Sequence, residues 1–207
     1  MVRVKVVNNE ADLRAISSKL KEGKKRTLDI KLNKPVKHEN YKELNSVIEK
    51  CSGFKSVSVR HYFSRGIDLR GFLEALSKNS DKKAYPLDIT DNEYADCCTS
   101  SLVALIRKKS LSALKLPDNV PEQDLDRILT EIKESSREMK FLKISKGPIL
   151  DTSIGIPQHL LKNGKILDLL DLSDCILTDE KKTLLLRSRK TRLFKNFHIC
   201  SHNLGQG

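Results

Sequence analysis

The sequence predicts an α/β repeat fold in which short strands and helices alternate along the chain. Three observations predict it. Eight segments carry two apolar residues separated by one residue, the alternation typical of a strand with one buried face. These pairs recur roughly every 28 residues, which indicates a repeated structural unit. Between the pairs, apolar residues are spaced three or four positions apart, as on the buried side of a helix. One strand and one helix cannot bury their apolar faces alone, so we expect the units to stack as a solenoid.

The strand pairs run along the whole chain. All sixteen residues at these positions are apolar, although hydrophobic residues make up only 38% of the sequence, so the pattern exceeds chance. The pairs are Val4/Val6, Ile30/Leu32, Val57/Val59, Leu87/Ile89, Leu114/Leu116, Leu142/Ile144, Leu170/Leu172 and Phe197/Ile199.

A segment with helical spacing follows each of the first seven strands. Pro121 and Glu122, just before Leu125, fit a first helical turn, where the N–H that proline lacks has no partner in any case. The helical segments contain Leu13/Ile16/Leu20, Tyr41/Leu44/Val47/Ile48, Phe72/Leu73/Leu76, Leu102/Leu105/Ile106, Leu125/Ile128/Leu129/Ile132, Leu160/Leu161 and Leu184/Leu185.

The residues that flank the strand pairs show a second regularity. A bulky apolar residue often stands three positions before the pair, and Asn or Cys often stands three positions after it, as at Asn92 and Cys175. The stretches LSALKLPDN (111–119) and LDLLDLSDC (167–175) match the pattern LxxLxLxxN/C in full. In this the chain resembles leucine-rich-repeat proteins of the ribonuclease-inhibitor-like type. Pro35, Tyr62 and Gly147 stand at the Asn/Cys position and mark degenerate turns.

The resemblance implies one right-handed leucine-rich-repeat solenoid that occupies residues 1–207. About eight parallel strands would line its concave face and about seven helices its convex face. In the family, the Asn or Cys side chain bonds backbone groups where the chain leaves the strand. The repeats would begin near residues 1, 27, 54, 84, 111, 139, 167 and 194.

A binding site is expected on the concave face, which solenoids of this family commonly use for ligands. Side chains between and just after the apolar pairs point out of the core. The first strands are basic there, and acidic spots occur near the middle and the end. The alternative is that these are simply solvated strand residues. The candidate partner-binding residues are Lys5, Lys31, Lys34, Arg60, Asp88, Asp91, Lys115, Lys143, Asp171, Asp174 and His198.

Composition narrows the class of partner. The formal net charge of +12 predicts attraction to acidic surfaces. Basic clusters also occur on the predicted helices: Lys19 to Arg26, Arg107 to Lys109, and Arg187 to Arg192. They leave binding of nucleic acid or anionic lipid open as an alternative. Few aromatic residues are present for base stacking (six Phe, four Tyr and no Trp), which argues against a specific nucleic-acid reader.

Nothing in the sequence predicts catalysis, a cofactor or a small-molecule substrate. We find no Gly-rich phosphate loop, no HExxH and no GxSxG motif, and the five histidines are scattered. The five cysteines form no CxxC pair and no zinc-ligand spacing, so we expect free thiols in a reducing cytosol. No apolar run is long enough for a signal peptide or a membrane span.

The sequence therefore favours a non-catalytic module that binds a protein of acidic or mixed charge. The small, lysine-rich, irregular repeats are similar to leucine-rich-repeat effectors that bacterial pathogens deliver into host cells. This resemblance implies a cytoplasmic location, in the bacterium before delivery and in the host afterwards. A second hypothesis is the substrate-recruiting subunit of a ubiquitin-ligase-type assembly, which would require an F-box-like or catalytic partner domain.

Overall fold

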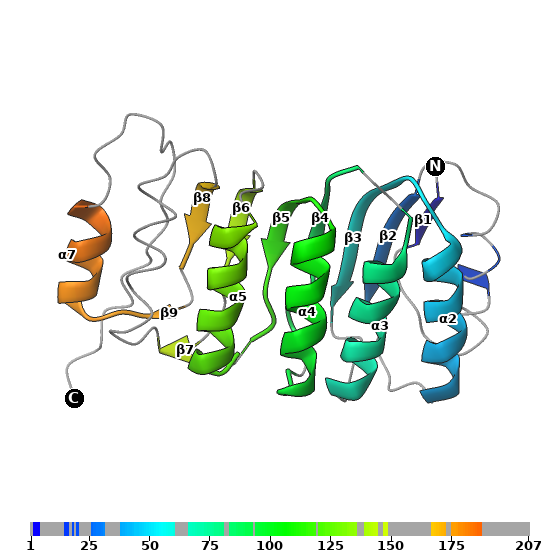
Figure 1. Ribbon diagram of the computed structural model, residues 1–207, viewed down its shortest axis with the longest axis horizontal. Coiled ribbons are helices and arrows are strands. Elements are labelled where there is room, and N and C mark those ends of the chain that lie inside the picture. The colour runs from blue at the N-terminus through cyan, green and yellow to red at the C-terminus, as the bar shows by residue number, and fades with distance from the viewer. Residues whose placement is uncertain are drawn as a thin grey trace.

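The computed structural model describes residues 2–4, 15–16, 18, 20, 26–31, 38–60, 66–80, 83–92, 94–118, 120–135, 139–144, 147–148, 167–172 and 175–187 (Figure 1).

Seven described strands form one all-parallel sheet, in which they lie side by side in chain order. They are β1 (Val2–Val4), β2 (Arg26–Lys31), β3 (Phe54–Arg60), β4 (Tyr85–Asp88), β5 (Leu111–Lys115), β6 (Met139–Lys143) and β8 (Leu167–Asp171). Two short strands, β7 (Gly147–Pro148) and β9 (Cys175–Ile176), pair with each other in parallel. The seven strands match the first seven predicted ones in order. The predicted count of about eight is not reached in this part of the chain, because Phe197/Ile199 lies outside the described residues.

The helices form a row on one face of the sheet. Helices α2 (His38–Lys50), α3 (Gly66–Lys78), α4 (Cys97–Lys108) and α5 (Glu122–Glu134) each connect one strand to the next and contact their neighbours in turn (Figure 1). Parallel crossovers share one hand, so strands laid down in chain order receive all their helices on the same side. Helix α7 (Asp179–Arg187) follows β9. Residues 15, 16, 18 and 20 are also helical, as predicted there, whereas Leu160/Leu161 lies outside the described residues.

The core lies between the sheet and the row of helices. Along β3, Val57 and Val59 are buried while Ser58 and Arg60 between and after them are partly exposed. On the helix side, Leu102, Leu105 and Ile106 of α4 are buried at the predicted spacing. The alternation leaves one sheet face, here called the open face, which no described helix covers. Its side chains are Thr27, Asp29, Lys31, Ser56, Ser58, Arg60, Pro86, Asp88, Ala113, Lys115, Phe141, Lys143, Leu169 and Asp171.

Asn92 and Cys175, which are three repeats apart, make equivalent contacts. The amide of Asn92 donates to the carbonyl of Val59 in the preceding repeat at 2.6 Å and to that of Ile89 at 2.8 Å. The thiol of Cys175 donates to the carbonyl of Ile144, again in the preceding repeat, at 3.2 Å. Asp91 has a positive φ of 60°, a left-handed conformation that Asp tolerates better than most residues and that turns the chain back here. The predicted role of the Asn/Cys position is confirmed at these two turns.

A second series of bonds, not predicted from the sequence, joins the ends of successive helices. Cys51, Asn79 and Lys109 each directly follow a helix, and each donates to a carbonyl of the preceding unit. Cys51 Sγ reaches the carbonyl of Leu20 at 3.4 Å, and Asn79 Nδ2 reaches that of Ile48 at 2.7 Å. Lys109 Nζ bonds the carbonyl of Asn79. The last carbonyls of a helix lack the usual partner within it, and these side chains donate to carbonyls at or just beyond the helix ends.

The register of β2 differs from the one predicted from the sequence. We predicted that Ile30/Leu32 is equivalent to Val57/Val59, but Leu28 and Ile30 occupy that register and both are fully buried. The segment LDIKL contains two overlapping apolar pairs, and only the neighbouring strand selects between them. Asp29, rather than Lys31, therefore lies in line with Ser58, and Lys31 pairs with Arg60.

Candidate functional site

One row of six side chains crosses the middle of the open face. Consecutive strands place these residues opposite one another in register, and we call them the central row: Asp29, Ser58, Asp88, Lys115, Lys143 and Asp171. Neighbouring strands in a sheet are about 4.8 Å apart, so these side chains are within reach of their neighbours. The structure thus brings together four of the predicted site residues, Asp88, Lys115, Lys143 and Asp171.

Two ion pairs bridge adjacent strands within the central row. Lys115 Nζ lies 3.0 Å from Asp88 Oδ2, and Lys143 Nζ lies 3.9 Å from Asp171 Oδ2. Cross-strand pairs of this kind contribute about 0.2–1 kcal/mol each. Lys115 and Lys143 are themselves direct neighbours in the register. The row therefore presents two adjacent cations between two anions.

Asp88 is held in place by several hydrogen bonds. Its Oδ1 accepts hydrogen bonds from the backbone N–H and the hydroxyl of Thr90, at 3.2 and 2.7 Å. Burial by itself would raise the pKa of Asp88. The bonds from Thr90 and Lys115 outweigh it and hold that pKa below its usual range. Asp88 is thus a fixed negative charge that also fixes the position of Lys115.

The basic character predicted for the first strands is partly neutralised. Arg60 lies 3.9 Å from Asp29, a carboxylate that the predicted site lacked. Its signal was present in the sequence, because Leu28 and Ile30 flank Asp29 just as other apolar pairs flank their central residue. Lys31 is exposed at the end of β2.

The remaining predicted site residues do not join the central row. Asp91 lies in the left-handed turn after β4, beyond the strand. Lys5, Lys34, Asp174 and His198 lie outside the described residues.

Sequence reasoning missed an apolar strip beside the central row. Four residues, each directly before the first member of an apolar pair, lie on the open face and are partly exposed: Pro86, Ala113, Phe141 and Leu169. Pro86 pairs with Ala113, Ala113 with Phe141, and Phe141 with Leu169. Side chains two positions apart share a strand face, so the alternation of the sequence was sufficient to place them there.

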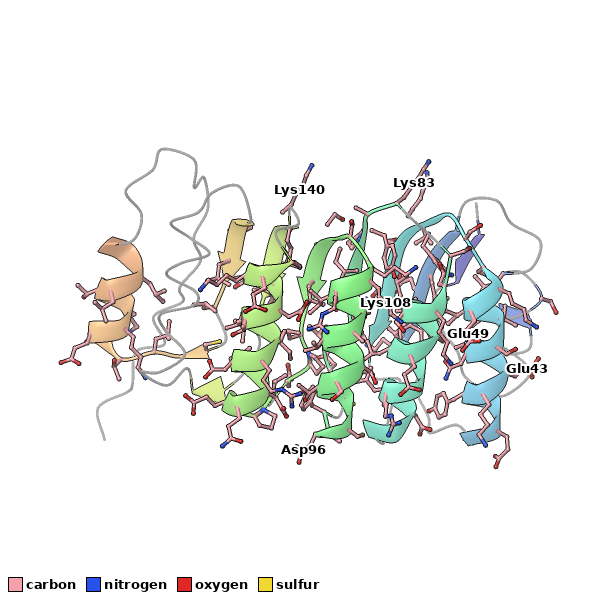
Figure 2. The ribbon with its side chains drawn as sticks, in the orientation of Figure 1. Glu43, Glu49, Lys83, Asp96, Lys108 and Lys140 are labelled. Atoms are coloured by element: carbon pink, nitrogen blue, oxygen red, sulfur yellow. The ribbon has the colours of Figure 1, made fainter. Side chains whose placement is uncertain are left out.

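The helix side offers less free positive charge than the sequence suggested. In the run Arg107 to Lys109, Arg107 makes two bonds to Glu131 of α5, at 3.1 and 2.6 Å. The ammonium of Lys109 is buried in its bond to Asn79. Lys108 remains exposed on α4 (Figure 2). The other two basic clusters lie mostly outside the described residues.

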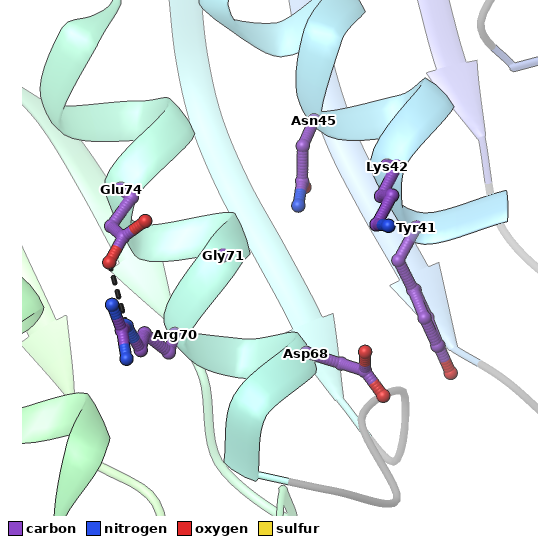
Figure 3. Close-up of a pocket in the computed structure, with 7 residues that line it drawn as sticks. All are labelled: Tyr41, Lys42, Asn45, Asp68, Arg70, Gly71 and Glu74. Atoms are coloured by element: carbon purple, nitrogen blue, oxygen red, sulfur yellow. Dashed lines mark hydrogen bonds and ion pairs between the residues drawn. The ribbon is translucent and has the colours of Figure 1, made fainter. Parts of the chain in front are cut away.

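A cleft of about 300 Å³ lies between α2 and α3 on the helix side (Figure 3). Arg70 Nε donates to Glu74 Oε1 at 2.8 Å, and this bond holds the pKa of Glu74 below its usual range. A Cβ at Gly71 would lie 3.0 Å from the amide of Asn45, so glycine there permits the close approach of the two helices. The approach of Gly71 to Asn45 places the cleft at the junction of α2 and α3, whereas the bond between Arg70 and Glu74 lies within α3. Its lining residues are Tyr41, Lys42, Asn45, Asp68, Arg70, Gly71 and Glu74.

Two kinds of site are missing from the part of the chain that the structure describes. No group of three or more His, Cys, Asp or Glu side chains there is placed to hold a metal ion. No helix among these residues is both long and apolar enough to cross a bilayer.

No protein-family profile matches the sequence, and no curated protein matches it either.

Proposed function

We propose that this chain is a leucine-rich-repeat solenoid of the ribonuclease-inhibitor-like type that binds a protein of acidic or mixed charge on its open face, without catalysis. Three features of the fold support the repeat assignment. The strands lie in chain order, the helices share one face, and Asn92 and Cys175 bond the preceding repeat in the same way. Stacked repeats of this kind present their strands as one continuous surface.

The central row is the observation that carries the binding proposal. Lys115 and Lys143 stand side by side, although like charges directly opposite each other destabilise a sheet. Asp88 and Asp171 orient them from either side. An acidic group of a partner placed over the two lysines would be attracted by both. Such charge complementarity chiefly governs partner choice and the rate of association.

The helix side is a weaker candidate for the binding surface than the open face. Some of its charges are paired within the fold, as in the pairs Arg107–Glu131 and Lys78–Glu49. Binding of nucleic acid or anionic lipid through the run Arg107 to Lys109 would have to compete with these contacts.

An exchange of charges tests the proposal while preserving the ion pairs. One variant combines Asp88→Lys with Lys115→Asp and Lys143→Asp with Asp171→Lys, which inverts the pattern of the row and leaves its net charge unchanged. The matched control exchanges the helix pair, Glu49→Lys with Lys78→Glu. In the wild type, Lys78 Nζ lies 3.2 Å from Glu49 Oε1. The two variants and the wild type are immobilised, and the proteins they retain from cell lysate are quantified by mass spectrometry.

We expect at least one protein to be retained by the wild type and the helix control but depleted on the row variant. Loss should be about tenfold or more, as is usual when charges at a binding site are reversed. Equal retention by all three proteins, with unchanged unfolding midpoints, would contradict the proposal.

A further inference from the structure

The fold does not require apolar residues at the positions that form the apolar strip. On β2 and β3 the same open-face position, directly before Leu28 and Val57, is occupied by Thr27 and Ser56, which pair with each other. The fold therefore accepts small polar residues there. From β4 onward the position is apolar in every described strand of the parallel sheet. A change from polar to apolar within equivalent, partly exposed positions indicates a contact surface in the second half of the array.

Cations border the strip on both sides. Lys115 and Lys143 of the central row lie two residues further along their strands, about 6.6 Å away. On the other side, Lys83 and Lys140 are exposed and extend beyond the edge where the strands begin (Figure 2). The carboxylates of Asp88 and Asp171 balance the inner lysines. Among these six side chains, four are cationic and two are anionic.

The dimensions fit one or two bulky side chains. Ala113, Phe141 and Leu169 stand on three neighbouring strands and face one another in register. At about 4.8 Å between strands, they span roughly 10 Å. Burial of a large apolar side chain on such a patch is favourable because it removes apolar surface of both partners from water.

We propose that the apolar strip docks a bulky apolar side chain from an acidic segment of the partner. The carboxylates flanking that side chain would meet Lys140 on one side and the pair of Lys115 and Lys143 on the other. This inference rests on the proposed function of the open face and adds the chemical class of the ligand, an acidic peptide with an apolar anchor.

A displayed library of short random peptides is the probe. It is selected on the immobilised full chain, and the enriched peptides are synthesised and their affinities measured by fluorescence anisotropy. The test variant combines Phe141→Ser and Leu169→Ser. Serine is the residue that β3 carries at the equivalent position, Ser56. Phe141→Leu keeps the strip apolar, and the helix exchange Glu49→Lys with Lys78→Glu is the surface control. Unfolding midpoints establish that each variant is folded.

The enriched peptides should combine acidic residues with a bulky apolar residue. Their affinity should fall about tenfold or more on the double serine variant, as for the loss of a buried anchor, and change little with Phe141→Leu or the helix exchange. Replacing the apolar residue of the peptide by serine should cause a similar loss. The two changes combined should cost less than their separate losses predict, which indicates direct contact.

Two results would overturn the inference, and they differ in what they say about the open face. If the peptides bind the double serine variant as tightly as the wild type but fail to bind the exchanged central row, the face binds ligands by charge alone. In that case the apolar anchor is wrong and the proposed function stands. If no peptide is enriched, or binding is insensitive to every open-face change, both are wrong.

Discussion

Replacement of Asn92 by alanine tests whether the turn asparagine joins successive repeats. Its side chain is buried, and its two shorter bonds reach the carbonyls of Val59 and Ile89. Alanine would leave both carbonyls without this donor, and a buried polar group that loses its partner costs about 1–3 kcal/mol. Allowing for relaxation, we expect the free energy of unfolding to fall by roughly 2–4 kcal/mol. For a chain of this size that lowers the midpoint of thermal unfolding by roughly 5–15 °C.

Two further variants calibrate the Asn92→Ala result. Asn92→Cys retains one donor of the kind that Cys175 uses at the equivalent turn, so its loss should be about half as large. Asn45→Ala makes the same change at a partly exposed position of α2 beside the cleft, where alanine is a good helix former, and should be within about 0.5 kcal/mol of the wild type. Unfolding is followed by circular dichroism with heat and with urea. A value for Asn92→Ala within about 0.5 kcal/mol of the wild type would refute the bridging role of this side chain.

Two other predictions concern titration. The pKa of Asp88 is lower in the folded chain than in the unfolded chain, so its contribution to stability is present above the unfolded pKa and is lost as the pH falls through the folded pKa. Urea unfolding between neutral and acid pH should therefore show a weaker pH dependence for Asp88→Asn, and an unchanged dependence would count against the stabilising bonds from Thr90 and Lys115. Burial raises the pKa of the Cys98 thiol to about 11, whereas Cys97 beside it is exposed. Iodoacetamide at mildly alkaline pH should therefore modify Cys97 well before Cys98, as peptide mass spectrometry would show, and equal rates would mean that Cys98 is accessible.

The sequence predicts the order of strands and helices well because each apolar residue serves a local pattern. The pairs around Ser58, Asp88 and Lys115 become buried strand residues, and the helical spacing of Leu102, Leu105 and Ile106 becomes the buried side of α4. Such periodicity follows from the geometry of one strand or helix, so it can be read from one segment at a time.

The failures share a cause, since each depends on a neighbouring strand or helix. The register with β3 makes Leu28 and Ile30 the pair that is equivalent to Val57 and Val59, whereas the predicted pair was Ile30 and Leu32. The pairing of Arg60 with Asp29 follows from that same register. Likewise, the burial of Lys109 requires the end of the preceding helix, where the carbonyl of Asn79 accepts its bond. Contacts between residues distant in sequence are set by stacking, which no single segment encodes.

The apolar strip differs from these failures. Ala113, Phe141 and Leu169 occupy a position that the alternation already assigned to the open face. The predicted site consists of charged residues between and after the apolar pairs and does not include the position before each pair. Charge distinguishes the lysines in the sequence, whereas the apolar members lie among many apolar residues of the core and carry no distinctive signal by themselves.

Lysine footprinting of the partner complex tests most directly whether the open face is the binding surface. The chain is acetylated alone and in the complex, and the reactivity of each lysine is compared by mass spectrometry. We expect Lys115 and Lys143 to be protected in the complex, while Lys108 and Lys133, exposed on α4 and α5, react as before. Protection of Lys108 and Lys133 with no change at Lys115 and Lys143 would contradict the account.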